Sequence, residues 1–165
     1  MLEISINIDT GAGFARLQKL FEDKTPFYRD ISATLKAASN RAFRDHVDPV
    51  TGEAWEELSP VTVARRGSSK RILTVTQALD NSVEPGYNND SAWISSNSAY
   101  ATTHYFGALK GSFGYKSGGT TKRGKPGKVR LLPWGDIPAR PFMGLGQEDK
   151  DDILDFISTR IKSIV

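Results

Sequence analysis

The sequence contains no cysteine, and this absence removes several kinds of chemistry at once. Without a thiol the chain cannot form a disulfide, a zinc–thiolate site or a cysteine nucleophile. Histidine is scarce as well, because His46 and His104 are the only two, and neither has a metal-ligating residue four positions further on. We therefore expect neither a metal ion nor a cofactor.

The sequence also lacks any long hydrophobic run. No apolar stretch approaches the roughly 20 residues of a membrane span, and the start at Met1-Leu2-Glu3 does not resemble a signal peptide. With 38% hydrophobic residues and a mean hydropathy of −0.39, the sequence is typical of one soluble domain covering residues 1–165. A chain of this length buries roughly 70% of its unfolded surface. We expect no membrane contact and synthesis in a cytosol.

Nothing in the sequence assembles a set of catalytic residues. The G-x-S-x-G turn of serine hydrolases is missing. Residues 119–125 match the start of a phosphate-binding loop, but Pro126 stands where the magnesium-binding hydroxyl belongs. His104 lies between Tyr100 and Phe106 and is interpreted as a packed structural histidine, with a hydrolase using His104 as a distant alternative. We predict that the protein is not an enzyme and has no catalytic residue.

Charge is spread unevenly along a chain whose net charge is +3. Residues 110–135 contain seven Lys or Arg and no Asp or Glu, whereas residues 147–156 contain five Asp or Glu and one Lys. The many glycines of residues 108–128 predict an exposed loop or β-ribbon. Such a basic loop can dock on an acidic protein, track a nucleic-acid backbone or stay solvated, and we favour the protein contact. Its candidate contact residues are Lys110, Lys116, Lys122, Arg123, Lys125 and Lys128.

Hydrophobic periodicity predicts an α+β fold. Alternating apolar residues at 2–8 indicate a strand, and turn residues at 88–90 indicate a hairpin over 83–95. Pro26 suits the first turn of a long helix over residues 26–46. The other expected elements are short helices near 11–21 and 76–81, a short helix or extended aromatic segment at 100–106, an irregular connection over 48–73, a strand at 129–134 and a C-terminal amphipathic helix.

We expect the three strand regions to form one small antiparallel sheet. It should pack against the long helix and the C-terminal helix, with long irregular loops around it. Large apolar side chains on the inner faces should supply most of the core. They are Phe27, Ile31, Leu35, Phe43, Trp55, Leu79, Trp93, Phe106, Phe142, Ile153, Ile157 and Ile161.

Four turn-rich motifs with large anchoring side chains punctuate the chain, at residues 48–55, 72–79, 100–107 and 137–145. Their turn-forming residues and aromatic rings are typical of segments that fix the shape of the backbone and make contacts, and less typical of catalytic sites. The residues expected to hold the shape of these motifs are Asp48, Pro49, Gly52, Trp55, Tyr100, His104, Gly107, Pro138 and Pro141.

Arg140 stands between Pro138 and Pro141 and has little backbone freedom. A guanidinium held in this way suits a bidentate contact with a carboxylate, either in a partner or in its own chain. We therefore take Arg140 and the neighbouring Phe142 as candidate contacts with a partner or a second copy of the chain.

The motifs, in this order and at these intervals, resemble those of the phage virion morphogenesis family, the tail-completion proteins of Mu-like contractile-tailed phages and prophages. The resemblance covers most of the chain, from about residue 30 onward. Gln77 departs from it, because the family usually has glycine there, and a positive φ at this position would strain a glutamine. The matching segments are Arg41-Ala42-Phe43, Asp48-Pro49, Gly52, Trp55, Ile72-Leu73, Tyr100-Ala101, His104, Phe106-Gly107 and residues 137–145.

The resemblance implies a structural protein that completes the tail or neck of a virion, so that tail and head can join. It also implies that other tail or neck proteins are the partners and that the chain forms a homo-oligomeric ring. By the same resemblance, the protein is made in the host bacterial cytoplasm and becomes part of the tail or neck of the virion. The alternative from the residues themselves is a nucleic-acid-binding module that uses the basic loop.

Overall fold

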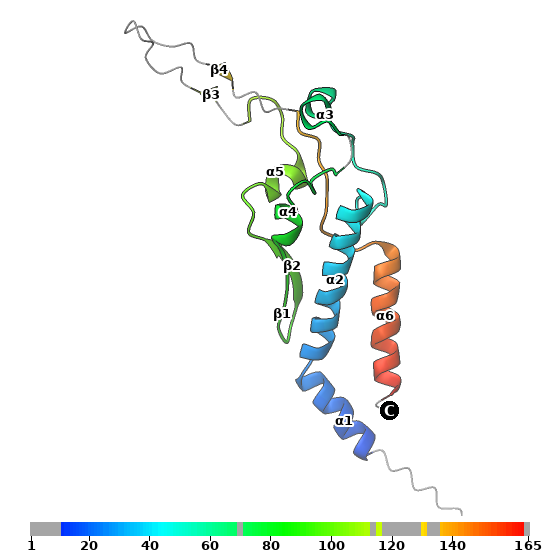
Figure 1. The fold of residues 1–165 in the computed structure, drawn as a ribbon. Helices are drawn as coiled ribbons and strands as arrows, with labels where there is room; N and C mark the ends of the chain where they lie inside the picture. Colours follow the sequence, from blue (N-terminus) through cyan, green and yellow to red (C-terminus); the bar gives the residue numbers. More distant parts are fainter. Residues whose placement is uncertain (1–10, 69–70, 113–114, 117–129, 132–135, 164–165) are drawn as a thin grey trace, which may run out of the picture.

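The computed structural model describes residues 11–68, 71–112, 115–116, 130–131 and 136–163. The strand expected at residues 2–8 lies outside this part of the chain. The described elements confirm an α+β fold: helices on both sides of a long central helix, and a small antiparallel hairpin beside it (Figure 1).

The central element is α2 (Thr25–Asp45), which follows the short helix α1 (Gly11–Glu22). Pro26 occupies its first turn, where a missing N–H costs nothing, and His46 ends it with a left-handed φ of 57°. The expected helix 26–46 is therefore confirmed. Its small residues Ala38, Ser39 and Ala42 are buried, which allows the neighbouring elements to approach the helix closely.

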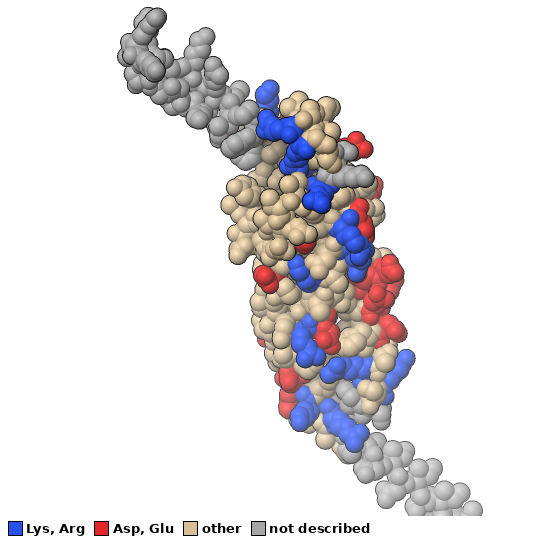
Figure 2. Space-filling model, in the orientation of Figure 1, with Lys and Arg blue, Asp and Glu red and all other residues tan. Residues whose placement is uncertain are grey.

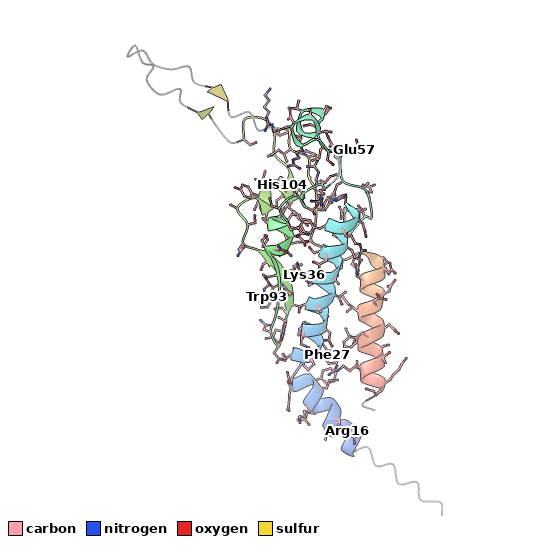
Figure 3. The ribbon with its side chains drawn as sticks, in the orientation of Figure 1. Arg16, Phe27, Lys36, Glu57, Trp93 and His104 are labelled. Carbon is pink, nitrogen blue, oxygen red and sulfur yellow. The ribbon has the colours of Figure 1, made fainter. Side chains whose placement is uncertain are left out.

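A hairpin of β1 (Val83–Tyr87) and β2 (Ala92–Ser96) packs along one side of α2, as predicted (Figure 1). Gly86 lies directly under the Trp93 ring, because a Cβ at Gly86 would come within 2.4 Å of the indole. Trp93 remains 44% exposed on the hairpin, so its predicted place in the core is wrong (Figure 3).

The prediction of a single sheet is wrong for the described strands. The strand β4 (Arg130–Leu131) pairs with β3 (Tyr115–Lys116) in a separate two-stranded ladder and does not join the hairpin. The pairing agrees with a β-ribbon, one of the two forms expected for the glycine-rich stretch. The backbone groups of β4 are paired with β3, the strand on the other side of the glycine-rich stretch, and so are not paired with the hairpin.

The stretch 48–73 contains a helix that the sequence analysis missed, α3 (Pro60–Arg66). Ser59 caps it by accepting a hydrogen bond from the Thr62 N–H, and Pro60 is its first residue. Serine and proline favour turns, but a serine cap followed by proline at the first helical position also begins helices. The prediction of an irregular connection did not take this helix-start signal into account.

The remaining helices agree with expectation, and residues 100–106 take the helical one of the two forms expected. These helices are α4 (Ala78–Asn81), α5 (Ala101–Phe106) and α6 (Gln147–Lys162). The C-terminal α6 packs beside α2, with the rings of Phe27 and Phe156 6.3 Å apart and edge to face (Figure 1). The guanidinium of Arg160 lies over both rings.

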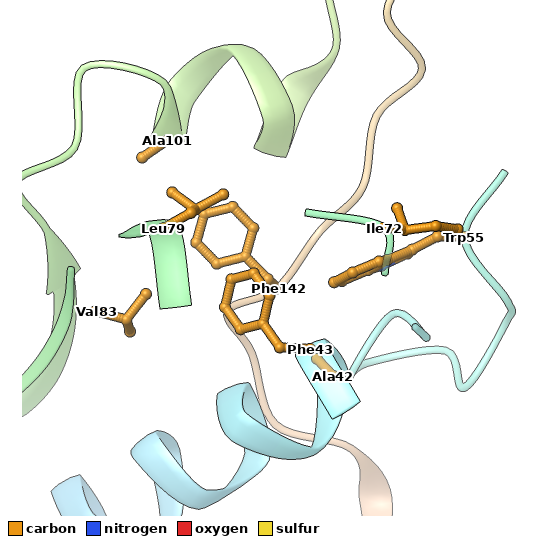
Figure 4. Packing of buried hydrophobic residues seen from close by; sticks show 8 residues of the cluster. All are labelled: Ala42, Phe43, Trp55, Ile72, Leu79, Val83, Ala101 and Phe142. Atoms are coloured by element: carbon orange, nitrogen blue, oxygen red, sulfur yellow. The ribbon is translucent and has the colours of Figure 1, made fainter. Parts of the chain in front are cut away.

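The core sits where α2 ends and the four motifs meet (Figure 4). Phe142 is fully buried, between Leu79 and Phe43, and Trp55 lies against Ile72. Phe43, Trp55, Leu79 and Phe142 were predicted correctly, whereas Phe106 is 73% exposed. The other predicted core residues are half-buried: Phe27, Ile31, Leu35, Ile153, Ile157 and Ile161.

Candidate functional site

Arg140 is the polar centre of the place where the motifs meet. Its side chain is 4% exposed and donates to the backbone carbonyls of Glu56, at 3.0 and 2.8 Å, and of Glu57, at 3.1 Å. The expected carboxylate partner is therefore replaced by carbonyl oxygens, which a planar guanidinium can bridge equally well. Burial lowers the pKa of Arg140, and the Glu56 carboxylate opposes that effect.

Trp55 anchors the 48–55 motif to the same segment. Its indole Nε1 donates to the Pro141 carbonyl at 2.8 Å, and its ring meets Phe43 edge to face. Phe43 in turn lies 5.0 Å from Phe142 between ring centroids. Arg140 and Phe142 are thus enclosed by their own subunit, and their contact with a partner stays a prediction.

The turn before Trp55 is held by Asp48, whose carboxylate accepts the Val50 N–H at 2.7 Å. Gly52 has φ +74°, a conformation that glycine adopts without strain. Pro49 lies against the 144–146 stretch, because a Cβ at Gly146 would come within 2.9 Å of the Pro49 carbonyl oxygen. The motif 48–55 therefore contacts the segment 137–146 at its beginning, through Pro49, and at its end, through Trp55.

The third motif joins through α5 and the residue after it. Gly107 has φ +74°, and a Cβ there would lie 2.7 Å from the Ile137 carbonyl oxygen. Directly after it, Ala108 and Ile137 exchange two backbone hydrogen bonds of 2.8 Å. Tyr105 adds a hydroxyl bond of 3.0 Å to the Met143 carbonyl. The expected role of Gly107 thus has a steric reason.

His104 and Tyr100 contribute to this motif mainly through their backbones. The His104 carbonyl accepts the Arg140 N–H at 2.8 Å, and the Tyr100 carbonyl accepts the His104 N–H. Tyr100 is 71% exposed, so its ring is not an internal anchor. The His104 side chain is half-buried, and its Nδ1 has no hydrogen-bond partner in the described part of the chain. Burial lowers the pKa of His104, and the positive charges of Arg140 and Arg66 lower it further.

The joining of α6 to α2 depends on Asp149, which the sequence analysis treated only as part of an acidic helix start. Its carboxylate pairs with Arg41 and also accepts the Gly146 N–H at 3.1 Å, so it caps α6 and holds it on α2. Asp149 lies at the third helical position after a glycine, and this capping signal could have revealed its role.

Two open grooves border this meeting place. The larger, about 880 Å³, runs between α3 and residues 136–140 and is lined by Leu58, Val61, Arg66 and His104 among others. The smaller groove, about 620 Å³, lies beside the exposed side chains of Phe106 and Leu109. Neither groove was expected from the sequence, because distant segments build both.

Charged side chains of both signs are spread over the surface. Acidic residues cluster beside the start of α6, and basic residues lie both at the end that carries α1 and at the end that carries α3 (Figure 2). Arg65, Arg66 and Lys110 are exposed there, and Lys116 belongs to β3. The other predicted contact residues lie outside the described part of the chain: Lys122, Arg123, Lys125 and Lys128.

The described residues contain no group of three or more His, Asp or Glu side chains that could hold a metal ion. In the same part of the chain, no helix is long and apolar enough to cross a bilayer.

The fold and the site define a framework protein, in which four motifs lock one subunit together. The chain belongs to the phage virion morphogenesis family, which matches residues 10–162. The resemblance of the motifs to this family is thereby confirmed.

Two relatives extend over nearly the whole chain. A putative capsid assembly protein G of Escherichia phage Mu is 28% identical over 170 residues, covering 97% of each chain. The Mu-like prophage FluMu G protein 2 of Haemophilus influenzae is 29% identical over 167 residues, covering 100% of this chain and 99% of the relative. No solved structure shows a significant match to this chain.

Proposed function

We propose that this chain is a structural component of a phage particle that acts, without catalysis, in tail completion or head–tail joining. The observation that carries the proposal is its membership of the virion morphogenesis family along residues 10–162. The relative from phage Mu bears the name of a putative capsid assembly protein, which supports an assembly role. The neck is the place where capsid and tail meet, so a joining role accommodates both descriptions.

The geometry of the site supports a framework role. The motif residues Trp55, Arg140 and Phe142 are buried and bonded within the subunit. A frame of this kind fixes the shape of the surfaces above it, which is what an assembly component requires. We expect those surfaces to contact other tail or neck proteins and further copies of the chain in a ring.

The test is electron microscopy of particles from a phage or prophage in which this gene alone is deleted. Filled heads beside unattached tails are expected, and a plasmid copy of the gene should restore joined particles. Normal joined particles from the deletion strain would overturn the proposal. Empty or malformed heads would instead move the role to capsid assembly.

A second candidate function, nucleic-acid binding, has one observation in its favour. Arg65, Arg66 and Lys110 add positive charge at the end where the basic ribbon begins. Duplex binding by this region should weaken steeply with salt, since each neutralised phosphate releases counterions. Fluorescence anisotropy at two salt concentrations, with Lys122, Arg123, Lys125 and Lys128 changed to glutamine, tests this function. Binding that survives the four changes would exclude the ribbon as the binding element.

A further inference from the structure

The two edges of the β1–β2 hairpin differ in their capacity to accept another strand. The register pairs Gly86 with Trp93 and Glu84 with Ser95, and the turn bond from the Asn88 N–H to the Ser91 carbonyl sets the phase of the ladder. In an antiparallel pair, hydrogen-bonded positions alternate with positions whose backbone groups point outward. The pairs that contain Tyr87, Pro85 and Val83 are therefore the outward ones on β1.

The outer edge of β1 is closed by Pro85. This residue lies at the middle outward position and has no N–H to donate. Proline at such a position is a recognised protection against further strand pairing.

The outer edge of β2 carries no such protection. Its outward positions are Ala92, Ile94 and Ser96, each with a backbone N–H and a carbonyl. Among the described residues, no strand or isolated bridge pairs with this edge. A two-stranded sheet is marginal by itself, and a third strand would satisfy these groups.

The faces of the hairpin define what kind of strand fits. Val83 is buried and Ile94 packs against the core, whereas Trp93 and Ser95 are exposed on the other face. An added strand should therefore alternate, with apolar residues on the inner face and polar residues on the outer face.

Residues 2–8 have this pattern. Leucine or isoleucine occupies positions 2, 4, 6 and 8, with Glu3, Ser5 and Asn7 between them. Seven residues in extended form span about 23 Å, enough for the roughly 17 Å of the five-residue β2.

The same chain cannot bring Ile8 to the tip of its own hairpin. The hairpin tip meets the end of α1, where the Asn89 amide donates to the Glu22 carbonyl at 3.1 Å. From there α1 runs away from the hairpin, and its 12 residues carry Gly11 about 17 Å further (Figure 1). The two residues between Ile8 and Gly11 bridge only about 10 Å.

We propose that residues 2–8 of one copy add as a third strand to the outer edge of β2 in a second copy. The proposal concerns self-association alone and does not depend on the role in the virion, so either can fail without the other. Because donor and acceptor are different surfaces, the contact runs head to tail and can extend into a ring.

The absence of natural cysteine makes disulfide trapping a direct test. Three variants, Glu3→Cys, Ser5→Cys and Asn7→Cys, are each mixed with a size-tagged Ser95→Cys chain under mild oxidation. These positions share the polar face of the proposed sheet, where neighbouring strands bring Cβ atoms about 5 Å apart. The matched control is Glu84→Cys, on the same face but one strand further, about 10 Å from the donor and outside disulfide range.

The expected result is a covalent pair between Ser95→Cys and at least one donor variant, at about five times the yield with Glu84→Cys or more. No such pair from any of the three donors would overturn the proposal. So would a chain carrying Ser5→Cys and Ser95→Cys together that, at high dilution, forms its bond within one molecule.

Sedimentation equilibrium gives a second measurement without cysteine. Ile6→Lys places a charge on the inner face of the proposed strand and should weaken self-association about tenfold or more. Asn7→Lys adds the same charge to the outer face and should leave association nearly unchanged. Equal effects of the two changes would contradict strand addition.

Discussion

Arg140 shows how a residue that seems made for contact with a partner can serve its own subunit. Two prolines fix its backbone, and the guanidinium is turned inward onto the carbonyls of Glu56 and Glu57. From sequence alone, a rigid arginine could be recognised, but not the direction of its side chain. The acceptors lie some 84 positions earlier in the chain, and backbone carbonyls carry no sequence signature.

Replacing Arg140 with methionine should lower the free energy of unfolding by about 2–4 kcal/mol, since two carbonyls lose their donors in a buried place. Urea unfolding measures the change. The exposed Arg65, changed to methionine in the same way, should cost less than about 0.5 kcal/mol. Equal, small losses at both positions would mean that Arg140 does not hold the motifs together.

Gln77 adopts φ 55° and ψ 8°, the left-handed conformation in which a glutamine was expected to be strained. A residue with a Cβ is strained there by about 1–2 kcal/mol, whereas glycine is not. Gln77→Gly should therefore stabilise the fold by about 0.5–1 kcal/mol, because the greater freedom of glycine in the unfolded chain offsets part of the gain. Thermal unfolding beside Gln77→Ala, which keeps the strain, separates this effect from loss of the glutamine side chain.

His104 should make stability depend on pH. Burial and two nearby arginines lower its pKa below the ordinary 6.5, so in acid the unfolded chain takes up a proton that the folded chain resists. Stability from this group is fully present above about pH 6.5 and falls as the pH drops toward the lowered folded pKa. Denaturant unfolding at about pH 7.5 and about pH 5.5 should show a smaller fall for His104→Gln. Parallel falls would contradict the assignment.

At the scale of elements, local signals predicted well wherever one segment decides its own structure. The Pro26 start of α2, the hairpin turn and the amphipathic α6 follow from short-range spacing. The exposure of side chains was harder to predict, since Trp93 and Phe106 are aromatic and yet no described element covers them. Whether a second layer covers a face depends on distant segments, and periodicity within an element does not reveal it.

The connection between α6 and α2 offers a prediction at this scale. Asp149→Ala removes both the ion pair with Arg41 and the cap on the Gly146 N–H, so it should cost about 1–3 kcal/mol of unfolding free energy. Asp151→Ala on the same helix removes only an exposed contact with Gln147 and should be nearly neutral. Similar costs for both would show that α6 is held by its apolar stripe alone.

At the scale of the whole molecule, the basic stretch 110–135 begins and ends beside one pair of bonded residues. Ala108 and Ile137 are joined by two backbone hydrogen bonds at the point where the ribbon leaves the frame. Replacing residues 110–135 with a four-residue Gly-Asn-Gly-Ser linker closes a shorter loop and should change stability by less than about 1 kcal/mol.

The same deletion tests what the ribbon does. If residues 110–135 contact a partner in the particle, the linker variant should fold normally and yet fail to restore joined particles in a strain that lacks the gene. Circular dichroism against temperature and electron microscopy of the complemented lysate check the two halves. Normal particles from the linker variant would reduce the ribbon to a solvated loop.

The position of Phe142 has a consequence for the order in which the protein is made. The ring at the centre of the core is that of Phe142, whereas the helix and the hairpin that pack with it end at residues 45 and 96. Because synthesis proceeds from the N-terminus, the helix and the hairpin are made before Phe142 and cannot complete the core until it is added. We expect prematurely terminated chains to remain unfolded and protease-sensitive. Translation errors would then be discarded before they could take a place in a growing particle, a form of quality control built into the sequence.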